Sequence, residues 1–176
     1  TKTLSFGDYK VGRGKKQLLT VGNTIEMKPG LHVLVAPNGI GKSTFFQTMA
    51  GVIPTQGGKI NYSPQEIFYA SEYLSFPRYV YGSEWISFKT KVSDVEEKSK
   101  EYVKKLRLEE PWTHYLGRMS QGERRKVVWI AAALSSANLV LLDEPFHGLD
   151  LLALPEAEKM IVEWIEARNR IVWVID

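Results

Sequence analysis

The fold of this chain is decided by one stretch of its sequence, A-P-N-G-I-G-K-S-T at residues 36–44. The stretch fits the pattern G-x-x-x-x-G-K-S/T at Gly41, Lys42 and Ser43, with Ala36 in the place of the first glycine. Small residues let several backbone N–H groups turn inward toward an anion, and a helix that follows adds its positive N-terminal end. The stretch therefore predicts a phosphate-binding loop rather than a glycine-rich turn that arises by chance.

The residues of this loop have separate expected roles around a bound nucleoside triphosphate. We expect Lys42 to reach the β and γ phosphates, Ser43 to ligate Mg²⁺, and Thr44 to place its hydroxyl near the α phosphate. The loop residues expected to bind ATP are Asn38, Gly39, Gly41, Lys42, Ser43 and Thr44. The loop therefore predicts a bound nucleoside triphosphate together with Mg²⁺, and the family resemblance described below implies that the nucleotide is ATP.

A second set of candidate site residues ends the apolar run in L-V-L-L-D-E-P at residues 139–145. Such a strand brings its last residues to the carboxyl edge of a parallel sheet, where ligands bind in open α/β folds. We expect Asp143 to hold Mg²⁺ through its water shell or through Ser43, and Glu144 to orient the attacking water as a general base. The alternative is structural, with Glu144 starting a turn at Pro145 and Asp143 capping a neighbouring element.

The rest of the chain alternates short apolar runs with amphipathic segments. Runs of this length without polar alternation are typical of buried parallel strands. They cover residues 31–35, 67–70, 139–142 and 171–175. Helices are expected at residues 42–50, 93–106, 121–134 and 155–168. The second of these helices is expected to begin with a capping box formed by Ser93 and Glu96. This alternation predicts an α/β fold with a mainly parallel sheet.

One part of the chain departs from this alternation. Residues 77–112 are rich in charged and aromatic side chains and contain no clear buried strand. We interpret them as a mostly helical insertion, which gives a helical subdomain at about residues 77–118. The length of 176 residues suits one domain that buries its own core, so we predict a single domain over residues 1–176.

The composition excludes several classes of protein. Cysteine is absent, which excludes a disulfide framework, a thiolate metal site and a cysteine nucleophile. The 23 Lys and Arg residues against 20 Asp and Glu give a formal net charge of +3, and the charges are mixed along the chain, so we expect no specific nucleic-acid partner. No stretch approaches the roughly 20 apolar residues of a membrane span, and the first residues lack a signal-peptide core. We therefore do not expect this chain to enter the membrane itself.

Two further motifs flank the acidic strand. R-M-S-Q-G-E-R-R-K at residues 118–126 resembles the L-S-G-G-Q signature of ABC-type ATPases, and F-H-G-L-D at residues 146–150 is similar to the S-A-L-D or S-G-L-D loop of that family. Phosphate loop, signature, acidic strand and D-loop occur in the family's order and cover most of the chain. The chain thus resembles an ABC nucleotide-binding domain. The resemblance implies a P-loop NTPase fold with a mainly parallel sheet, an N-terminal antiparallel β part and a small helical insert.

The resemblance also implies a composite ATP site between two ATPase domains that pair head to tail, as a homodimer or a heterodimer. In such a pair, Ser120 and the N–H groups of Gln121 and Gly122 face the γ phosphate of the partner's ATP, and Asp150 belongs to the D-loop. A helix N-terminus is a sound anion site on physical grounds as well. Without the resemblance, Ser120 fits an ordinary helix N-cap.

Two positions depart from the family's pattern. Glu72 stands where the family has a glutamine that helps to hold Mg²⁺, and Gln65 is the alternative if the preceding strand is shifted. Tyr9 is the expected adenine-stacking residue and Phe6 the alternative, while G-R-G at residues 12–14 occupies a position where the family often has tyrosine. Either aromatic ring could instead be buried in the first strand.

The last departure follows the run at residues 171–175. In the family the corresponding strand is followed at once by a switch histidine that contacts the γ phosphate, whereas this sequence ends at Asp176. We expect the domain to be incomplete at its C-terminus, and the chain by itself to hydrolyse ATP weakly. The histidines of this sequence lie in the wrong places to replace the switch residue; they are His32, His114 and His147.

The resemblance implies an ATP-hydrolysing subunit that powers transport of a solute through separate transmembrane permease subunits, on the cytoplasmic face of the membrane. Aromatic residues of the insert could dock such a partner, or could pack the insert against the main domain; they include Tyr79, Tyr81, Trp85 and Phe88. The alternatives are a soluble ABC-type ATPase acting on a nucleic-acid, ribosome or cofactor-assembly complex, and a nucleotide-gated binding module with little turnover. A P-loop kinase would leave the motif at residues 118–126 without a role.

Overall fold

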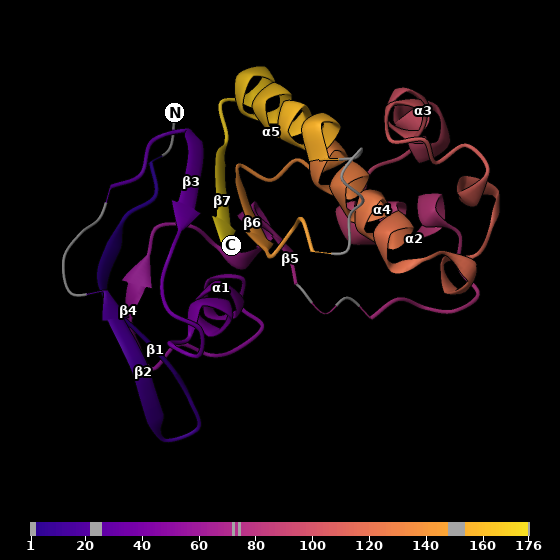
Figure 1. Ribbon diagram of the computed structural model, residues 1–176. Coiled ribbons are helices and arrows are strands. Elements are labelled where there is room, and N and C mark those ends of the chain that lie inside the picture. The colour runs from indigo at the N-terminus through magenta and orange to yellow at the C-terminus, as the bar shows by residue number, and fades with distance from the viewer. Residues whose placement is uncertain (1–2, 22–25, 72, 74, 148–153, 176) are drawn as a thin grey trace. The chain divides into compact units, whose positions relative to one another are not determined.

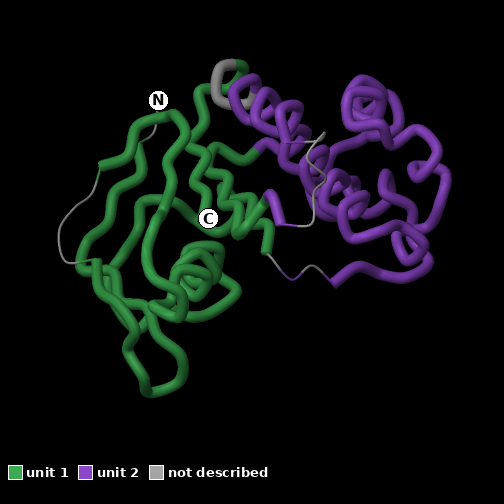
Figure 2. The backbone as a smooth tube through the Cα atoms, in the orientation of Figure 1, with its two compact units in different colours: residues 1–72, 137–145, 164–176 green, residues 73–136, 146–163 purple. Residues whose placement is uncertain are grey.

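The chain divides into two units in the computed structural model, which describes residues 3–21, 26–71, 73, 75–147 and 154–175. One unit consists of residues 1–72, 137–145 and 164–176, and the other of residues 73–136 and 146–163 (Figure 2). We refer to them as the sheet unit and the helical unit. Each unit contains segments that are distant in the sequence, so neither one forms from a single continuous stretch of chain.

The sheet unit contains a four-stranded parallel sheet of β3 (Gly30–Leu34), β5 (Ile67–Ala70), β6 (Leu139–Asp143) and β7 (Ile171–Ile175). The strand order is β3-β7-β6-β5, and each neighbouring pair is parallel (Figure 1). The four predicted strands are thus confirmed to within one residue at each end. The α/β fold with a mainly parallel sheet is confirmed as well.

The expectation that all four strands are buried is wrong for β3. Every residue of the two central strands β6 and β7 is buried. β3 lies at the edge of the sheet, and its residues alternate between half-buried and exposed, with Leu31 48% and Val33 54% exposed. A central strand has a neighbour on each side, whereas the environment of an edge strand depends on what packs against it.

An antiparallel sheet forms the N-terminal part of the same unit, as expected. It has the order β2-β1-β4, with β1 at Phe6–Arg13, β2 at Lys16–Val21 and β4 at Gly57–Ile60. β1 pairs antiparallel with both neighbours, and the short turn between β1 and β2 makes them a hairpin. Figure 1 shows this hairpin extending below the helix α1 (Lys42–Met49), which follows β3.

Aromatic side chains from three segments pack together in the core of the sheet unit. The ring of Phe45 on α1 lies 5.4 Å from that of Trp173 on β7 and 5.7 Å from that of Phe6 on β1. Phe46 lies at the same 5.4 Å from Trp173. Such tilted and edge-on pairs add to the burial of large apolar surfaces. The core therefore fixes α1, and with it the loop that precedes α1, against both sheets of this unit.

The helical unit contains α2 (Gly82–Thr90), α3 (Val95–Lys105) and α4 (Gln121–Leu134), together with the 3₁₀ turns η2 (Pro111–Thr113) and η3 (Leu116–Arg118). A further 3₁₀ turn, η1 (Pro64–Glu66), belongs to the sheet unit, and α5 (Leu154–Arg168) precedes β7. Residues 77–112 are mostly helical and contain no strand, as expected. None of the helices in the described residues is both long enough and apolar enough to cross a membrane.

The predicted capping box at the start of α3 is wrong. The helix begins at Val95 after Asp94, whose φ of 54° places it in the left-handed region, and no side chain caps this end. Glu96 instead accepts a hydrogen bond of 3.0 Å from the indole N–H of Trp112. The carboxylate of Glu96 thus binds Trp112, 16 residues further along the chain, instead of the backbone of Ser93.

A candidate nucleotide site in the sheet unit

The predicted phosphate loop connects β3 to α1, as the sequence indicates. Gly39 has a φ of 82° and Gly41 a φ of 108°, in the left-handed region that a side chain disfavours. Gly41 is also the N-cap of α1, and its carbonyl accepts the N–H of Phe45 at 2.8 Å. Ala36 is not among the residues with positive φ, so alanine fits there without strain. The loop thus needs glycine only at the two glycines that it retains.

Lys42 closes this loop across its ends. Its ammonium group donates a hydrogen bond of 2.7 Å to the carbonyl oxygen of Ala36. The positive charge is therefore held beside the backbone N–H groups of the loop and the N-terminal end of α1. These three features attract anions in the same place.

Ser43 and Asp143 meet although they are distant in the sequence. The hydroxyl of Ser43 donates to Oδ1 of Asp143 at 3.1 Å, and Asp143, the last residue of β6, is 1% exposed. The hydroxyl of Tyr69 donates to the other carboxylate oxygen at 3.4 Å. Burial, together with the negative charge of Asp143, raises the pKa of Tyr69, so this phenol stays protonated and able to donate.

A hydroxyl and a carboxylate in contact are suitable ligands for a hard cation. Mg²⁺ prefers oxygen ligands and usually takes only one or two protein groups, with water and phosphate oxygens completing its shell. The described residues contain no cluster of three or more His, Cys, Asp or Glu side chains that would form a complete protein cage. Ser43 and Asp143 therefore fit a magnesium ion that is shared with a nucleotide.

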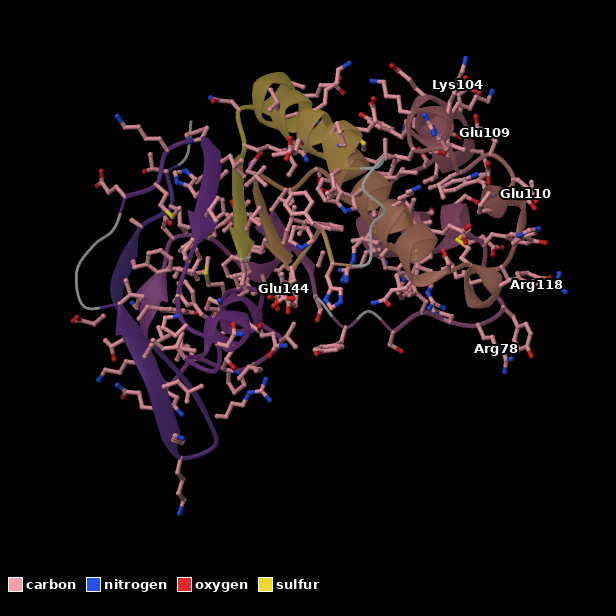
Figure 3. All side chains as sticks on the ribbon, viewed as in Figure 1. Arg78, Lys104, Glu109, Glu110, Arg118 and Glu144 are labelled. Carbon is pink, nitrogen blue, oxygen red and sulfur yellow. The ribbon has the colours of Figure 1, made fainter. Side chains whose placement is uncertain are left out.

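Glu144, labelled in Figure 3, directly follows β6, and its backbone conformation is unusual for its residue type. Its φ is 46°, and its N–H donates to the carbonyl of Ile175 at 2.9 Å. A non-glycine residue in this region carries a strain of about 1 kcal/mol or more, which the surrounding structure must offset. The parallel neighbour β7 thus holds the turn that positions Glu144.

These residues surround one pocket of about 310 Å³, which is within the range of about 300–1,000 Å³ of small-molecule sites. The predicted site residues that line it are Asn38, Gly39, Gly41, Lys42, Ser43, Thr44 and Glu144. Leu18 and Ile175 complete the lining, and neither was predicted from the sequence. Both are apolar strand residues, so no local pattern distinguishes them from residues of the core.

Tyr9, the expected adenine-stacking residue, is buried in the core of the sheet unit. Tyr9 is 4% exposed, and its ring lies 5.9 Å from that of Phe6 and 6.3 Å from that of Phe45. Phe6 is equally buried. Both rings therefore contact other aromatic side chains of the core. The alternative, burial in the first strand, holds for both residues.

Arg13 is a residue near the site that sequence reasoning gave no role. Its Nε–H donates to the hydroxyl of Thr44 at 3.3 Å, and its Nη2 donates to the side-chain oxygen of Gln47 at 3.0 Å. Both acceptors are on α1, directly after the phosphate loop. The arginine within G-R-G at residues 12–14 was the signal that could have pointed to it.

Ser120 is the N-cap of α4 in the helical unit. Its hydroxyl accepts the N–H of Glu123 at 3.2 Å, and its own N–H donates to the carboxylate of Glu123 at 2.7 Å, which together form a capping box. The cap uses the hydroxyl as an acceptor, and its O–H hydrogen is still a donor. Gln121 and Gly122 form the first turn of this helix. The local fold thus gives Ser120 a structural function, whether or not it also contacts a ligand.

The cap predicts a loss of stability in Ser120→Ala. We expect the free energy of unfolding to fall by about 1 kcal/mol, because the N–H of Glu123 loses its acceptor. Urea denaturation would measure this change. Ser120→Asp is the matched control, because aspartate caps helices as well as serine does, and it should unfold close to the wild type. Equal midpoints for wild type and Ser120→Ala would contradict the cap.

The remaining predicted residues lie elsewhere. Glu72 and Asp150 fall outside the described residues. Gln65, the alternative to Glu72, lies in the 3₁₀ turn η1. In the helical unit, Tyr79 and Phe88 are largely exposed, at 74% and 75% respectively. Of the other aromatic residues considered for docking, Tyr81 packs on Tyr115 at 4.5 Å and Trp85 packs on Phe76 at 5.0 Å.

The sequence is similar to a known family and to characterised proteins. The model of the ABC transporter family matches residues 23–147. The taurine import ATP-binding protein TauB of Escherichia coli O6:K15:H31 (strain 536 / UPEC) is 27% identical over 184 residues, which cover 96% of this chain and 70% of that protein.

Solved structures share the fold. A putative ABC transporter ATP-binding protein from Pyrococcus furiosus superposes with a TM-score of 0.84 at 22% identity, over 99% of this chain and 91% of that chain. The archaeal ribosome recycling factor aABCE1, solved in complex with the ribosomal stalk protein aP1, gives 0.79 at 26% identity, over 99% of this chain and 34% of that chain.

Proposed function

This chain belongs to the ABC transporter family, and from that membership we propose that it powers the transport of a solute across a membrane by hydrolysing ATP. Members of the family hydrolyse ATP, and its relatives are ATP-binding proteins. One observation carries the proposal for this chain. A single pocket is lined by Lys42, Ser43 and Glu144, and Ser43 is bonded to Asp143.

Binding of the triphosphate falls to the loop and to α1. The inward N–H groups and the N-terminal end of α1 attract the phosphates, and Lys42 supplies a full positive charge. Its ammonium now donates to Ala36, an uncharged acceptor that a phosphate oxygen can replace at little cost. Thr44 adds a hydroxyl at the start of the helix. Asn38, Gly39 and Gly41 form the rest of the lining.

Ser43 and Asp143 are the residues that would hold Mg²⁺. The ion, when bound, neutralises charge on the phosphates and favours their transfer to water. Tyr69 donates to Asp143 and so orients the carboxylate toward Ser43. Glu72 is proposed as an additional contact to the ion through water.

Glu144 is proposed as the catalytic base. It lines the same pocket as the loop and directly follows Asp143, so its carboxylate lies on the side where the terminal phosphate would be. A carboxylate in that place accepts a proton from water as the water oxygen bonds to the terminal phosphorus. The bond between this phosphorus and the bridging oxygen breaks, so that ADP leaves and inorganic phosphate is the second product. The strained backbone at Glu144 agrees with a residue held for function.

A second ATPase domain is proposed to complete the site. In a head-to-tail pair, Ser120, Gln121 and Gly122 would face the partner's ATP, and Asp150 would lie in the D-loop. The free O–H donor of Ser120 and the N-terminal end of α4 support this role, because both attract a phosphate oxygen.

The work of transport is proposed to pass to separate transmembrane subunits, with this chain on the cytoplasmic face of the membrane. The similarity to TauB, a taurine import ATP-binding protein of E. coli, supports import as the direction. Tyr79 and Phe88 of the helical unit are 74% and 75% exposed, which leaves both rings accessible to a protein partner.

A soluble ATPase that acts on ribosomes is the second candidate. The likeness to the archaeal ribosome recycling factor favours it, although this chain spans about a third of that protein. Cell fractionation separates the two candidates. Co-sedimentation with membrane vesicles that carry a permease supports transport, whereas co-sedimentation with ribosomes supports the second candidate.

The composite site predicts a change of mass in solution. Glu144→Gln should bind Mg-ATP without consuming it, so that ATP can hold two chains together, and light scattering should show a monomer without ATP and a dimer with it. Adding Lys42→Ala to this variant is the control, because the doubly substituted chain should stay monomeric. A Glu144→Gln chain that binds ATP tightly and stays a monomer at every concentration would overturn the composite site.

A further inference from the structure

We propose that Arg13 binds the phosphate chain of the nucleotide next to Thr44, and that this contact replaces aromatic stacking on the base. The proposal rests on the proposed nucleotide site and assigns it one more binding residue. It has a consequence for specificity. A nucleotide that is held mainly by its phosphates is distinguished only weakly by its base, so this site should accept GTP nearly as well as ATP.

The contacts of Arg13 place its guanidinium beside Thr44, a residue that lines the pocket. The guanidinium donates to Thr44 and Gln47, and Thr44 lines the pocket. Both acceptors are uncharged, and no salt bridge of Arg13 occurs in the part of the chain that the structure describes. The guanidinium has five N–H donors in a planar fork that suits phosphate oxygens. The two acceptors thus use two of the five N–H donors and do not neutralise the positive charge of Arg13.

The hairpin that carries Arg13 has a specific irregularity. Val11 pairs with Leu19 but Gly12 pairs with Gln17, so Leu18 is an extra residue on β2. Bulges of this kind change the direction of side chains and often occur next to active sites. Here the bulge lies directly before Arg13 on one strand and at the pocket residue Leu18 on the other.

Close packing keeps this end of the hairpin in place. A Cβ atom at Gly12 would lie 2.3 Å from the carbonyl oxygen of Lys16 and 2.4 Å from the side chain of Gln56, so only glycine fits there. The side-chain amide of Gln56 donates to the carbonyl of Gly14 at 2.9 Å. Arg13 therefore extends from a braced segment, which lowers the entropy that it loses when it binds a ligand.

The hairpin also touches the phosphate loop directly. A Cβ atom at Gly41 would lie 3.3 Å from the side chain of Leu18, which shows how closely the two segments pack. The hairpin thus forms one wall of the pocket. Arg13 lies beside Thr44, the lining residue to which its Nε–H donates, and a phosphate bound next to Thr44 would be within reach of the guanidinium.

The lining of the pocket suits a ligand that is recognised by its charge rather than by an aromatic contact to its base. Among the described lining residues, Lys42 is the only cation, and none is aromatic. A triphosphate carries several negative charges near neutral pH. Tyr9 and Phe6 are buried in the core, so neither reaches the base. Arg13 supplies the charge, and the base is left to weaker contacts.

The test compares three probes, Mg-ATP, Mg-GTP and inorganic tripolyphosphate with Mg²⁺, by isothermal titration calorimetry. Arg13→Ala and Arg13→Gln should weaken all three by about tenfold, because each loses one charge-assisted contact. Arg13→Gln keeps a long polar side chain that can still reach Thr44, so it separates charge from packing. Lys15→Ala, which removes one charge from the turn of the same hairpin, is the matched control and should bind as the wild type does.

Three results would overturn the proposal. Loss of ATP affinity with unchanged tripolyphosphate affinity would mean that Arg13 stacks on the base. Wild-type affinity in Arg13→Gln would mean that it only packs against Thr44 and Gln47. A strong preference of the wild type for ATP over GTP would exclude recognition by phosphates alone. A wild type that binds none of the three probes would instead refute the proposed nucleotide site itself. Thermal unfolding of each variant checks that the fold is retained.

Discussion

Glu144→Gln is expected to lower the kcat of ATP hydrolysis by about a hundred- to ten-thousand-fold, the range that a general base contributes. Glutamine has nearly the same shape as glutamate, but its amide cannot accept the proton of the attacking water. Glu144 lines the pocket together with the phosphate loop, and its backbone is fixed by the hydrogen bond to Ile175. The substitution should therefore remove proton acceptance and leave the positions of the neighbouring groups unchanged.

ATP binding separates this outcome from a general loss of the site. Since the phosphate contacts come from Lys42 and the loop, the affinity of Glu144→Gln for Mg-ATP should stay close to that of the wild type. Single-turnover hydrolysis and equilibrium binding measured on the same preparation would show both. Glu84→Gln, an exposed carboxylate in α2, is a control for the loss of one negative charge. An unchanged kcat in Glu144→Gln would assign the base to another residue.

Lys42→Ala is expected to weaken the binding of Mg-ATP by about a hundredfold or more, because charge-assisted contacts to two phosphates are lost together. Lys42 is the only cation among the described residues that line the pocket. Its ammonium also closes the loop through the carbonyl of Ala36, so the variant loses a structural contact as well as the charge. Titration calorimetry with Mg-ATP would measure the loss.

Two further variants show whether the loss of ATP affinity in Lys42→Ala comes from the lost charge or from a disturbed loop. Lys28 is an exposed residue that precedes β3. Lys28→Ala therefore removes the same charge outside the pocket and should bind ATP as the wild type does. Lys42→Gln keeps a donor that can reach Ala36 but has no charge, and it should bind as weakly as Lys42→Ala. Full ATP affinity in Lys42→Gln would contradict an electrostatic role for Lys42.

Some features of this protein follow from short stretches of sequence. The apolar runs predicted all four strands of the parallel sheet, and the helix at residues 121–134 has the bounds that its pattern gives. The pattern of the loop predicted small residues at Gly39 and Gly41, and both take left-handed backbone angles that glycine adopts readily. These features depend on the conformations open to each residue and on the period of apolar side chains, and both are local properties.

Other features were decided by contacts between segments that are distant in the sequence. Ser43 and Asp143 meet because β3, β7 and β6 are neighbours in one sheet, and their bond is a property of that order. The same strand order places β3 at the edge of the sheet, where Leu31 and Val33 are exposed. The bond from Trp112 to Glu96 replaced a local cap in the same way.

The hairpin shows most clearly what the sequence could and could not determine. The sequence by itself specified a phosphate loop, a strand before it and a helix after it, because these depend on local backbone preferences. Only the tertiary structure buried Tyr9 and brought Arg13 to Thr44, since a bulge and the packing of Gly12 against Gln56 set which way each side chain points. When both faces of a strand carry aromatic and charged residues, the local sequence does not show which face is buried. The elements that pack against the strand determine this.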